Sequence, residues 1–594
     1  MKKIFTKLLS VVLAMCVALP LAACGPTGGP AGPEGVGDRL SITLHFNRGG
    51  VQSAWFYDVV NRFQEATKDN PYGSKTGIYV DWNEATVTKL DGMNTSGTNI
   101  YMANGGSLDK YIKDGSVMDI TDVVTSVNPY DGKTIESKLS DNKSHFYKNG
   151  NYYALPWKEY FIGTTHNIDI FEKNGLYFAD VTGVAGAVPY TNNAGYNGRP
   201  CYFIAENGNC EKTAGVDGIP GTYDDGLPTS LEELMALCHK IKELGTNWFP
   251  FACTGGIHED YTNYLTEAIL IGLEGAERFG NYKDCDGEME IVTGYTKDIL
   301  WGLEDVYVPT TTTVRVDKTD KSTWVNISKS VNRYYAIAFI KYLEKNLMIC
   351  DCIRNPGSSN ISVQEGFIFS DTYMNESTHH SAMIIEGSYW YTESEHNGNF
   401  GKWDNYMVGE DRPEFGIMPY PVAVGGHVEG VETSLAYLTS DATIVINNNL
   451  MLDEENNKYV IEACKEFLYF FYSDQEIANY IEATGQNRSK TNFDWQSLVY
   501  DKDENGNYKN GLNGTERVIK ADCKIPNYQI TVLELERDSK LLDLEPTEFN
   551  PTSFIKLSTT SALMSPDGAA FYSVFKNGTM TVQQAFEATF IRGE

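Results

Sequence analysis

The chain has 594 residues, with 79 acidic against 48 basic side chains and a net charge of −31. Such a field repels nucleic acid and anionic lipid headgroups, and no basic stripe offsets it, so nucleic acid is excluded as a partner. A chain of this length exceeds one ordinary hydrophobic core and should divide into at least two lobes.

Residues 1–23 have the pattern of a lipoprotein signal peptide. Three lysines among the first seven residues form a positive start, and the apolar stretch that follows is too short for a comfortable membrane span. The sequence Leu-Ala-Ala-Cys ending at Cys24 reads as a lipobox, in which Cys24 carries the lipid and becomes the new N-terminus. Residues 24–38 are otherwise a Gly/Pro-rich tether. We expect a lipid-anchored protein on the extracytoplasmic face of the cell membrane.

Nine cysteines remain beyond Cys24 and the signal peptide. Their odd number and the absence of a repeated CxxC spacing argue against a disulfide scaffold and against a zinc ribbon. Cys201 and Cys210 can pair across a loop, and the sequence leaves their disulfide state open. Cys238 and Cys464 lie in apolar helical stripes, which predicts core thiols.

The first lobe begins with a β-α-β pattern. Residues 40–46 alternate apolar and polar side chains, residues 55–66 carry an apolar helical face, and residues 77–82 give the next strand. Such a unit forms a parallel pair in a covered sheet, and ligands bind at the carboxyl ends of its strands. Arg48 and Asn104 follow predicted strands and are candidates for lining a cleft. Tight glycine turns are the alternative for both loops.

The sequence of residues 151–171 predicts that the chain passes here from one lobe to the other. A strand of aromatic and apolar residues ends at Pro156, and Trp157 follows among polar residues before a second apolar run. A strand that leaves one apolar body, exposes a tryptophan and enters another suits a two-lobed protein with a cleft. An ordinary buried strand with a turn is the alternative for this segment alone.

The remainder of the chain predicts further helices and some β structure. A capping box of Ser230 with Glu233, or of Thr229 with Glu232, starts the first of these helices. Threonine-rich residues 293–326 predict β structure. Apolar helical faces recur over residues 231–244, 331–347, 459–471 and 477–481.

Several motifs, in a consistent order, resemble bacterial extracellular solute-binding protein family 1, the maltose-binding-protein-like lipoproteins that bind sugars for ABC transporters. YALP and the following THNIDIF, within residues 153–171, are similar to the family's first crossing between lobes. AMIIEGSYW at residues 382–390 is similar to its "A-M-x-x-x-G-x-W" element, and GIMPYP at residues 416–421 to the next strand. The resemblance covers nearly the whole chain. It implies an α/β, two-lobed, periplasmic-binding-protein-like fold with a hinge and an interlobe cleft.

The resemblance also implies how the chain is divided, with three crossings between the lobes. The third crossing is expected at residues 486–489, and inserts are expected near residues 180–228 and 280–330. The expected parts are residues 39–160 (lobe 1), 161–440 (lobe 2), 441–488 (lobe 1) and 489–594 (lobe 2 and the C-terminal helices).

Sugar recognition needs flat apolar surfaces for C–H faces and planar polar groups for hydroxyls, held in a preformed cleft. By resemblance, Trp157 and Trp390 are the leading candidates for stacking on the ligand, with structural packing as an equal alternative. For the other candidate binding residues core or rim packing is favoured individually. These are Tyr389, Glu159, Tyr153, Tyr420, Trp82 and Tyr261.

One insert has the composition of a calcium loop. Asp217, Asp224 and Asp225 lie in a Gly-rich stretch whose carboxylates supply the hard oxygens that Ca²⁺ prefers. The spacing is not that of an EF-hand, and a plain acidic turn is the favoured alternative. We expect no cofactor other than this possible structural calcium.

The sequence contains no HExxH, no GxSxG and no Cys/His pair with a known local signature. A pair of carboxylates for glycoside hydrolysis remains an alternative, because the sequence does not show how far apart two carboxylates lie. We expect a monomeric, non-enzymatic lipoprotein that captures a carbohydrate, in particular an oligosaccharide, and delivers it to an ABC transporter permease. The alternatives are a cell-surface glycosidase and a glycan-binding lipoprotein without a transport role.

Overall fold

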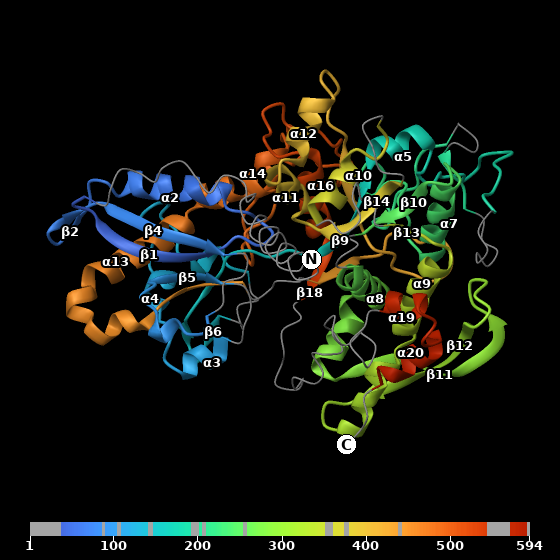
Figure 1. Cartoon of the computed structure of the whole chain (residues 1–594), viewed down its shortest axis with the longest axis horizontal. Coiled ribbons are helices and arrows are strands. Elements are labelled where there is room, and N and C mark those ends of the chain that lie inside the picture. Colours follow the sequence, from blue (N-terminus) through green and yellow to red (C-terminus); the bar gives the residue numbers. More distant parts are fainter. Residues whose placement is uncertain are drawn as a thin grey trace, which may run out of the picture.

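The computed structural model describes residues 37–85, 90–103, 108–140, 146–191, 201–204, 210–253, 258–350, 360–372, 379–436, 442–542 and 571–590. Two five-stranded mixed sheets, each with its own helices and core, form two lobes, lobe 1 on the left and lobe 2 on the right of Figure 1. The expected α/β, two-lobed fold is confirmed. The tether, Cys24 and Asn104 lie outside the described residues. Within them, no helix combines the length and apolar character needed to cross a membrane.

The sheet of lobe 1 has the strand order β4-β1-β5-β17-β8. Its strands β1, β4 and β5 are parallel, whereas β17 is antiparallel to both β5 and β8. The strands are β1 (Leu40–Asn47), β4 (Ile78–Ala85), β5 (Ile100–Ala103), β8 (Leu155–Pro156) and β17 (Thr443–Ile446).

Lobe 1 forms because its local patterns match the sheet. In β1 the alternate residues Ile42, Leu44 and Phe46 are fully buried, and Phe56 on the apolar face of α2 (Ala54–Ala66) stacks on Phe46 with ring centroids 4.2 Å apart. The predicted β-α-β unit is therefore confirmed. The remaining elements are β2 (Pro71–Tyr72), β3 (Lys75–Thr76), η1 (Met93–Thr95), α3 (Leu108–Lys113), α4 (Thr121–Thr125), η2 (Glu136–Lys138), β6 (Tyr147–Lys148), β7 (Asn151–Tyr152), η4 (Asn448–Asp453), α13 (Glu454–Phe471), α14 (Asp474–Thr484) and α15 (Gln496–Val499).

The sheet of lobe 2 has the strand order β13-β10-β14-β9-β15. Strands β13, β10 and β14 are parallel, and β9 runs antiparallel to β14 and β15. The strands are β9 (Ile162–Asn167), β10 (Trp248–Ala252), β13 (Ile349–Cys350), β14 (His380–Gly387) and β15 (Phe415–Met418).

Helices of lobe 2 start where the sequence places caps. Ser230, rather than Thr229, caps α7 (Leu231–Lys242) by accepting from the Glu233 amide, and Thr581 forms a capping box at α20 (Val582–Ala588). The other elements are α5 (Ile168–Asn174), α8 (His258–Asp284), α9 (Val331–Lys345), α10 (Asn360–Ile368), α11 (Trp390–His396), α12 (Asn399–Tyr406), β16 (Thr433–Ala436), α16 (Asn527–Asp538), β18 (Ser539–Leu542) and α19 (Phe571–Lys576).

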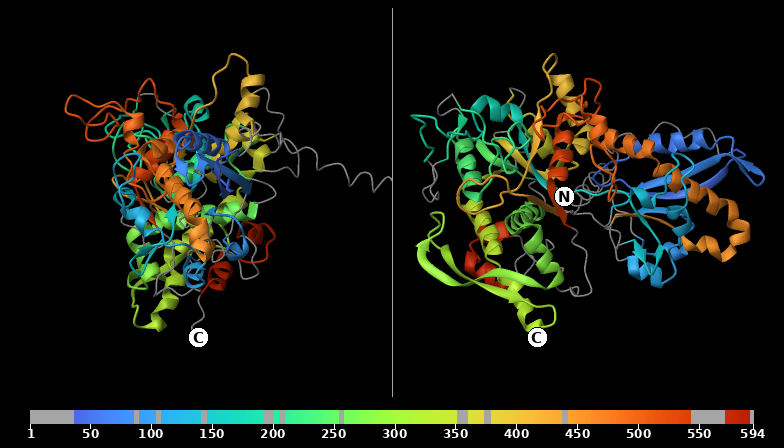
Figure 2. Two further views of the ribbon diagram at one scale, coloured as in Figure 1. Left: turned by 90° about the vertical axis from the view of Figure 1, so that its left-hand side faces the viewer. Right: turned by 180° about the vertical axis from the view of Figure 1, so that it is seen from behind.

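The threonine-rich insert forms an antiparallel ribbon of β11 (Gly287–Ile299) and β12 (Tyr307–Val316), followed by η3 (Lys321–Lys329). Buried residues of these elements pack with the end of α8 into a small separate core. The ribbon lies at the bottom of lobe 2, beside α19 and α20, in both Figure 1 and the rear view of Figure 2. The predicted β structure is confirmed.

The last return to lobe 2 differs from the expected boundary. Trp495, Val499, Tyr500 and Ile525 are buried in the core of lobe 1, although the sequence places residues 489–594 in lobe 2. The chain instead reaches lobe 2 at α16, which packs against β15. The segment is largely polar and contains little regular secondary structure, and the burial of these few side chains decides its lobe.

Candidate ligand-binding site

Residues 157–161 join the carboxyl ends of the two sheets. The start of β17 pairs with Pro156 and with Ala103, the last residue of β5. The start of β9 pairs with Gly387, the last residue of β14. This first crossing therefore leads from the carboxyl end of β5 to the carboxyl end of β14. Open α/β sheets bind ligands at such ends.

Two tyrosines meet at this junction. Tyr160 in the crossing and Tyr389 in the turn after β14 have ring centroids 4.7 Å apart, with an angle of 77° between the rings, and both side chains are half-buried. Gly50 of lobe 1 has a φ of +80°, and a Cβ there would lie 3.2 Å from the Tyr160 ring and 3.4 Å from the Tyr389 ring. We call residues 47–50 with Tyr160 and Tyr389 the interlobe site. Its rings offer flat surface of the kind that binds sugar C–H faces.

Ionisable groups from both lobes border the interlobe site. Arg48, predicted to line the cleft, lies 3.6 Å from the Glu84 carboxylate, and the two side chains are 40% and 36% exposed. His396 of α11, in lobe 2, has its pKa lowered by burial and by the positive charge of Arg48. The loop after β1 and helix α11 are therefore close enough to interact electrostatically.

Glu159 holds the first crossing to another segment of the chain. Its carboxylate accepts hydrogen bonds from the Ser489 hydroxyl at 2.9 Å and from the Lys490 amide at 3.2 Å, and the residue is buried. The structure therefore shows Glu159, a candidate ligand contact, in a structural role that joins residues 157–161 to residues 486–490.

A buried pair of carboxyl groups lies behind Tyr389. The Gln364 amide nitrogen donates to Glu386 Oε1 at 3.4 Å and to Glu393 Oε2 at 2.9 Å. Ser394 donates to the other end of the same amide, at 3.1 Å, which fixes its orientation. Burial, and for Glu386 also the neighbouring Glu393 carboxyl, raises the pKa of both groups. Protonation of one of the two carboxyl groups relieves this repulsion.

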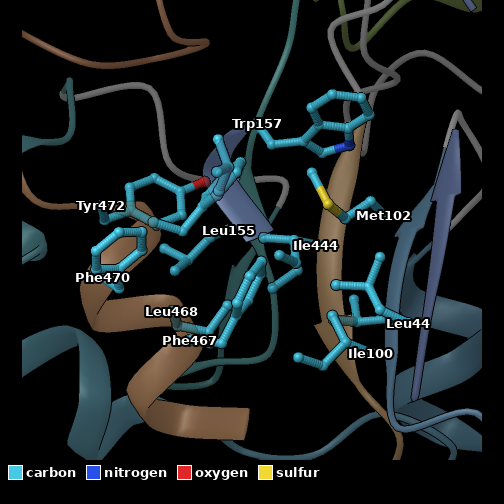
Figure 3. Packing of buried hydrophobic residues seen from close by; sticks show 14 of the residues in the cluster. Leu44, Ile100, Met102, Leu155, Trp157, Ile444, Phe467, Leu468, Phe470 and Tyr472 are labelled. Carbon is cyan, nitrogen blue, oxygen red and sulfur yellow. The ribbon is translucent and has the colours of Figure 1, made fainter. Parts of the chain in front are cut away.

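Trp157 and Trp390 do not face a ligand in this structure. Both side chains are fully buried. Figure 3 shows Trp157 among core residues of lobe 1, and its indole N–H donates to the Ala103 carbonyl at 3.3 Å. Trp390 packs against aromatic residues of lobe 2, with its ring centroid 5.0 Å from Phe415 and 5.3 Å from Tyr528. Of the two expectations, stacking and packing, the structure supports packing, because each indole turns into its own lobe.

The other candidate binding residues have separate locations. Trp82 is half-buried beside Tyr57, with ring centroids 4.7 Å apart. Tyr153 packs against the lobe 1 core, and Tyr420 and Tyr261 are buried in the core of lobe 2. The favoured expectation of core or rim packing agrees with these positions.

Residues 486–488 carry buried polar groups with unused hydrogen-bonding capacity beside the core of lobe 1. Within the described part of the chain, neither amide atom of the Gln486 side chain has a hydrogen-bond partner, and neither do Arg488 Nε and Nη1. The Arg488 guanidinium lies 3.9 Å from the centre of the Phe471 ring and 4.3 Å from that of Tyr480. Such groups are costly unless a partner such as water or a ligand satisfies them.

The Asp-rich loop is held together by its own hydrogen bonds. Asp224 accepts from the amides of Val216 and Asp217, at 2.8 and 3.2 Å, and Asp225 accepts from the Gly221 amide at 2.7 Å. In the described part of the chain, no three His, Cys, Asp or Glu side chains are grouped to hold a metal ion. The geometry fits the acidic turn, and calcium binding stays a prediction.

Replacing Asp217 with asparagine should change how stability depends on pH. Burial and Asp224 raise the pKa of Asp217 from 3.8 to about 7. The folded state therefore keeps a proton that the unfolded state releases, and the parent loses stability as the pH rises from about 4 to 7. We expect the melting temperature of Asp217→Asn to rise relative to that of the parent between pH 5 and pH 8.

The exposed Asp298→Asn variant serves as the control and should follow the parent across the same range. Calcium added to metal-stripped protein at pH 8 separates the two interpretations of the loop. A rise in the melting temperature of the parent but not of Asp217→Asn would support a calcium site. Equal pH responses of parent and Asp217→Asn would contradict the assignment of the shift to this carboxyl.

Several site residues were missed by the sequence reasoning. Tyr160, Lys158 and Gly50 follow the ends of predicted strands, which is the signal that pointed to Arg48. Glu386 stands out as an acid in the apolar run AMII, a pattern that indicates a buried functional carboxyl. No pattern in the sequence pairs it with Gln364, because the two lie on separate elements.

No profile of a known protein family matches the sequence. No curated protein matches it. Three similar solved structures are a chitin oligosaccharide binding protein (14% identical, TM-score 0.48, covering 93% of this chain and 98% of the other), RafE of Streptococcus pneumoniae with raffinose (11%, 0.46, 93% and 100%), and a Bacillus licheniformis sugar transporter with stachyose (12%, 0.44, 93% and 98%). Each of the three is named for a sugar or is in complex with one.

Proposed function

We propose that the chain is the carbohydrate-binding lipoprotein of an ABC importer. It is anchored through Cys24 on the extracytoplasmic face of the membrane and captures its ligand between two lobes. The observation that supports this function is the interlobe site, where half-buried Tyr160 and Tyr389 meet the carboxyl end of β1 at a crossing between two independently packed sheets. A monomer with this arrangement performs capture without chemistry.

Closure of the lobes provides the binding step. A ligand that touches residues of both lobes stabilises the closed arrangement over the open one, by the difference between its contacts in the two states. Tyr160 and Tyr389 supply apolar faces, and Arg48 and Glu84 supply hydrogen-bonding groups at the rim. An oligosaccharide matches this combination of flat faces and hydroxyls.

Titration of the purified protein with a panel of neutral oligosaccharides tests the proposal. We expect at least one sugar to bind, to raise the melting temperature and to reduce the radius of gyration measured by small-angle X-ray scattering. At a ligand concentration of 100 times Kd, binding should stabilise the folded state by about 2.7 kcal/mol. If no sugar of the panel changes the melting temperature or the radius of gyration, the proposal of carbohydrate capture is contradicted.

Glu386 and Glu393 favour one alternative, a glycosidase. Their carboxylate oxygens both lie within 3.4 Å of one nitrogen, so the two acids are close, as in hydrolytic enzymes that use paired carboxyls. Glu386 is 1% exposed, which keeps it from direct contact with substrate in this structure. Release of reducing ends by the parent and its loss in Glu386→Gln would replace the binding proposal with hydrolysis. Intact sugars after prolonged incubation would exclude it.

A further inference from the structure

A buried lysine contacts the loop that forms the lobe 1 side of the interlobe site. Lys158, in the first crossing, is fully buried, and its Nζ donates to Asn47 Oδ1 at 2.6 Å and to the Gly49 carbonyl at 2.5 Å. The same Asn47 oxygen accepts from the Gly49 amide at 3.1 Å. The Lys158 side chain thus forms hydrogen bonds with both ends of the turn that precedes Gly50.

We propose that Lys158 is a positioning residue for ligand binding: it holds residues 47–50 in the shape that meets Tyr160 and Tyr389. This inference rests on the proposed function. Gly50 leaves only 3.2 and 3.4 Å between an added Cβ and the two tyrosine rings, so a small change in the loop changes the surface presented to a ligand. Lys158 acts through the loop, because its own side chain is closed off from solvent.

The surroundings of Lys158 are those of a loop anchor rather than of an ion pair. No ion pair of Lys158 is found in the described part of the chain, and both acceptors are neutral oxygens. The Nζ atom also lies 4.7 Å from the Trp157 ring centre and 5.8 Å from that of Tyr160. Burial lowers the pKa of Lys158 from 10.5 to about 7, and a neutral amine still has two N–H groups for its two acceptors.

Lys158→Met tests the role, since it keeps the length of the side chain and removes both donors. We expect the affinity for the best oligosaccharide of the panel to fall roughly tenfold, measured well below the melting temperature. Lys158→Gln, with two N–H groups on a shorter chain, should lie between Lys158→Met and the parent. The control is Lys173→Met, on the surface of lobe 2, where Lys173 pairs with Asp371 at 2.6 Å.

A pH series supplies a second readout. The unfolded chain keeps the lysine proton up to a pH near 10.5, whereas the folded protein releases it near 7. The stability of the parent should therefore rise relative to that of Lys158→Met between pH 7 and 9. The charged and titratable side chains of the interlobe site and of the first crossing, Arg48, Glu159, Tyr160 and Tyr389, are retained in both proteins.

The outcomes separate this inference from the proposed function. If no sugar binds the parent, the proposed function fails first. If the parent binds a sugar and both Lys158 variants bind it as tightly as the parent does, Lys158 has no positioning role and the proposed function stands. If Lys158→Met does not fold, Lys158→Gln decides, and affinity equal to that of the parent would overturn the inference. A lower melting temperature without a lower affinity would show a purely structural lysine.

Discussion

Replacing Trp390 with alanine is expected to lower the free energy of unfolding by about 3–5 kcal/mol, because the indole is fully buried among aromatic side chains. The cavity left behind removes contacts with Phe367, Phe415 and Tyr528. Urea denaturation monitored by circular dichroism measures the change. Ligand affinity of the folded fraction should change little, since the side chain does not reach the interlobe site in this structure.

Trp390→Phe is the matched control. The indole Nε1 has no hydrogen-bond partner among the described residues, so phenylalanine removes none of the hydrogen bonds found there and fills most of the same space. Its loss of stability should be well below that of the alanine variant. Near-parental stability of Trp390→Ala together with a large loss of affinity would mean that Trp390 forms a wall of the cleft when the lobes open.

Alanine at Tyr160 or at Tyr389 is expected to weaken sugar binding by roughly ten- to a hundredfold. By analogy with the stacking of bases on aromatic side chains, one lost partner costs about 1–3 kcal/mol. Both rings are half-buried at the junction, so their removal leaves the two hydrophobic cores intact. Isothermal titration with the best ligand, beside a melting curve for each variant, measures the two effects separately.

Tyr160→Phe retains the ring and should keep most of the affinity, which isolates stacking from hydrogen bonding by the hydroxyl. Tyr406→Ala, on the exposed surface of α12, controls for the loss of a tyrosine elsewhere, since that side chain is 48% exposed. Unchanged affinity in both interlobe alanine variants would place the ligand elsewhere on the molecule.

Comparison of the tryptophans with the tyrosines shows where sequence reasoning reached its limit. The motifs around Pro156 and Gly387 correctly indicated the ends of strands at which the lobes meet. They did not indicate which aromatic side chain in each motif points outward. Trp157 and Trp390 are buried in the cores, whereas Tyr160 and Tyr389 lie at the junction between the lobes. After a strand ends, the direction of a side chain depends on how the chain turns, and residues distant in sequence decide that turn.

The sequence by itself determined the local elements of this protein and their order. Alternation in β1, the apolar face of α2 and the cap at Ser230 all appear in the structure, because strand and helix periods and caps depend on neighbouring residues. These patterns, in their family-like order, also indicated two lobes.

Only the tertiary structure decided which residues meet. The contact of Gly50 with Tyr160 and Tyr389 joins separate elements of both lobes, and the amide of Gln364 shared by two glutamates joins three separate elements of lobe 2. Such contacts follow from strand register and from the packing of helices on each sheet, which depend on the sum of many distant contacts. The same reason applies to Trp495, Val499, Tyr500 and Ile525, whose side chains are buried in the core of lobe 1.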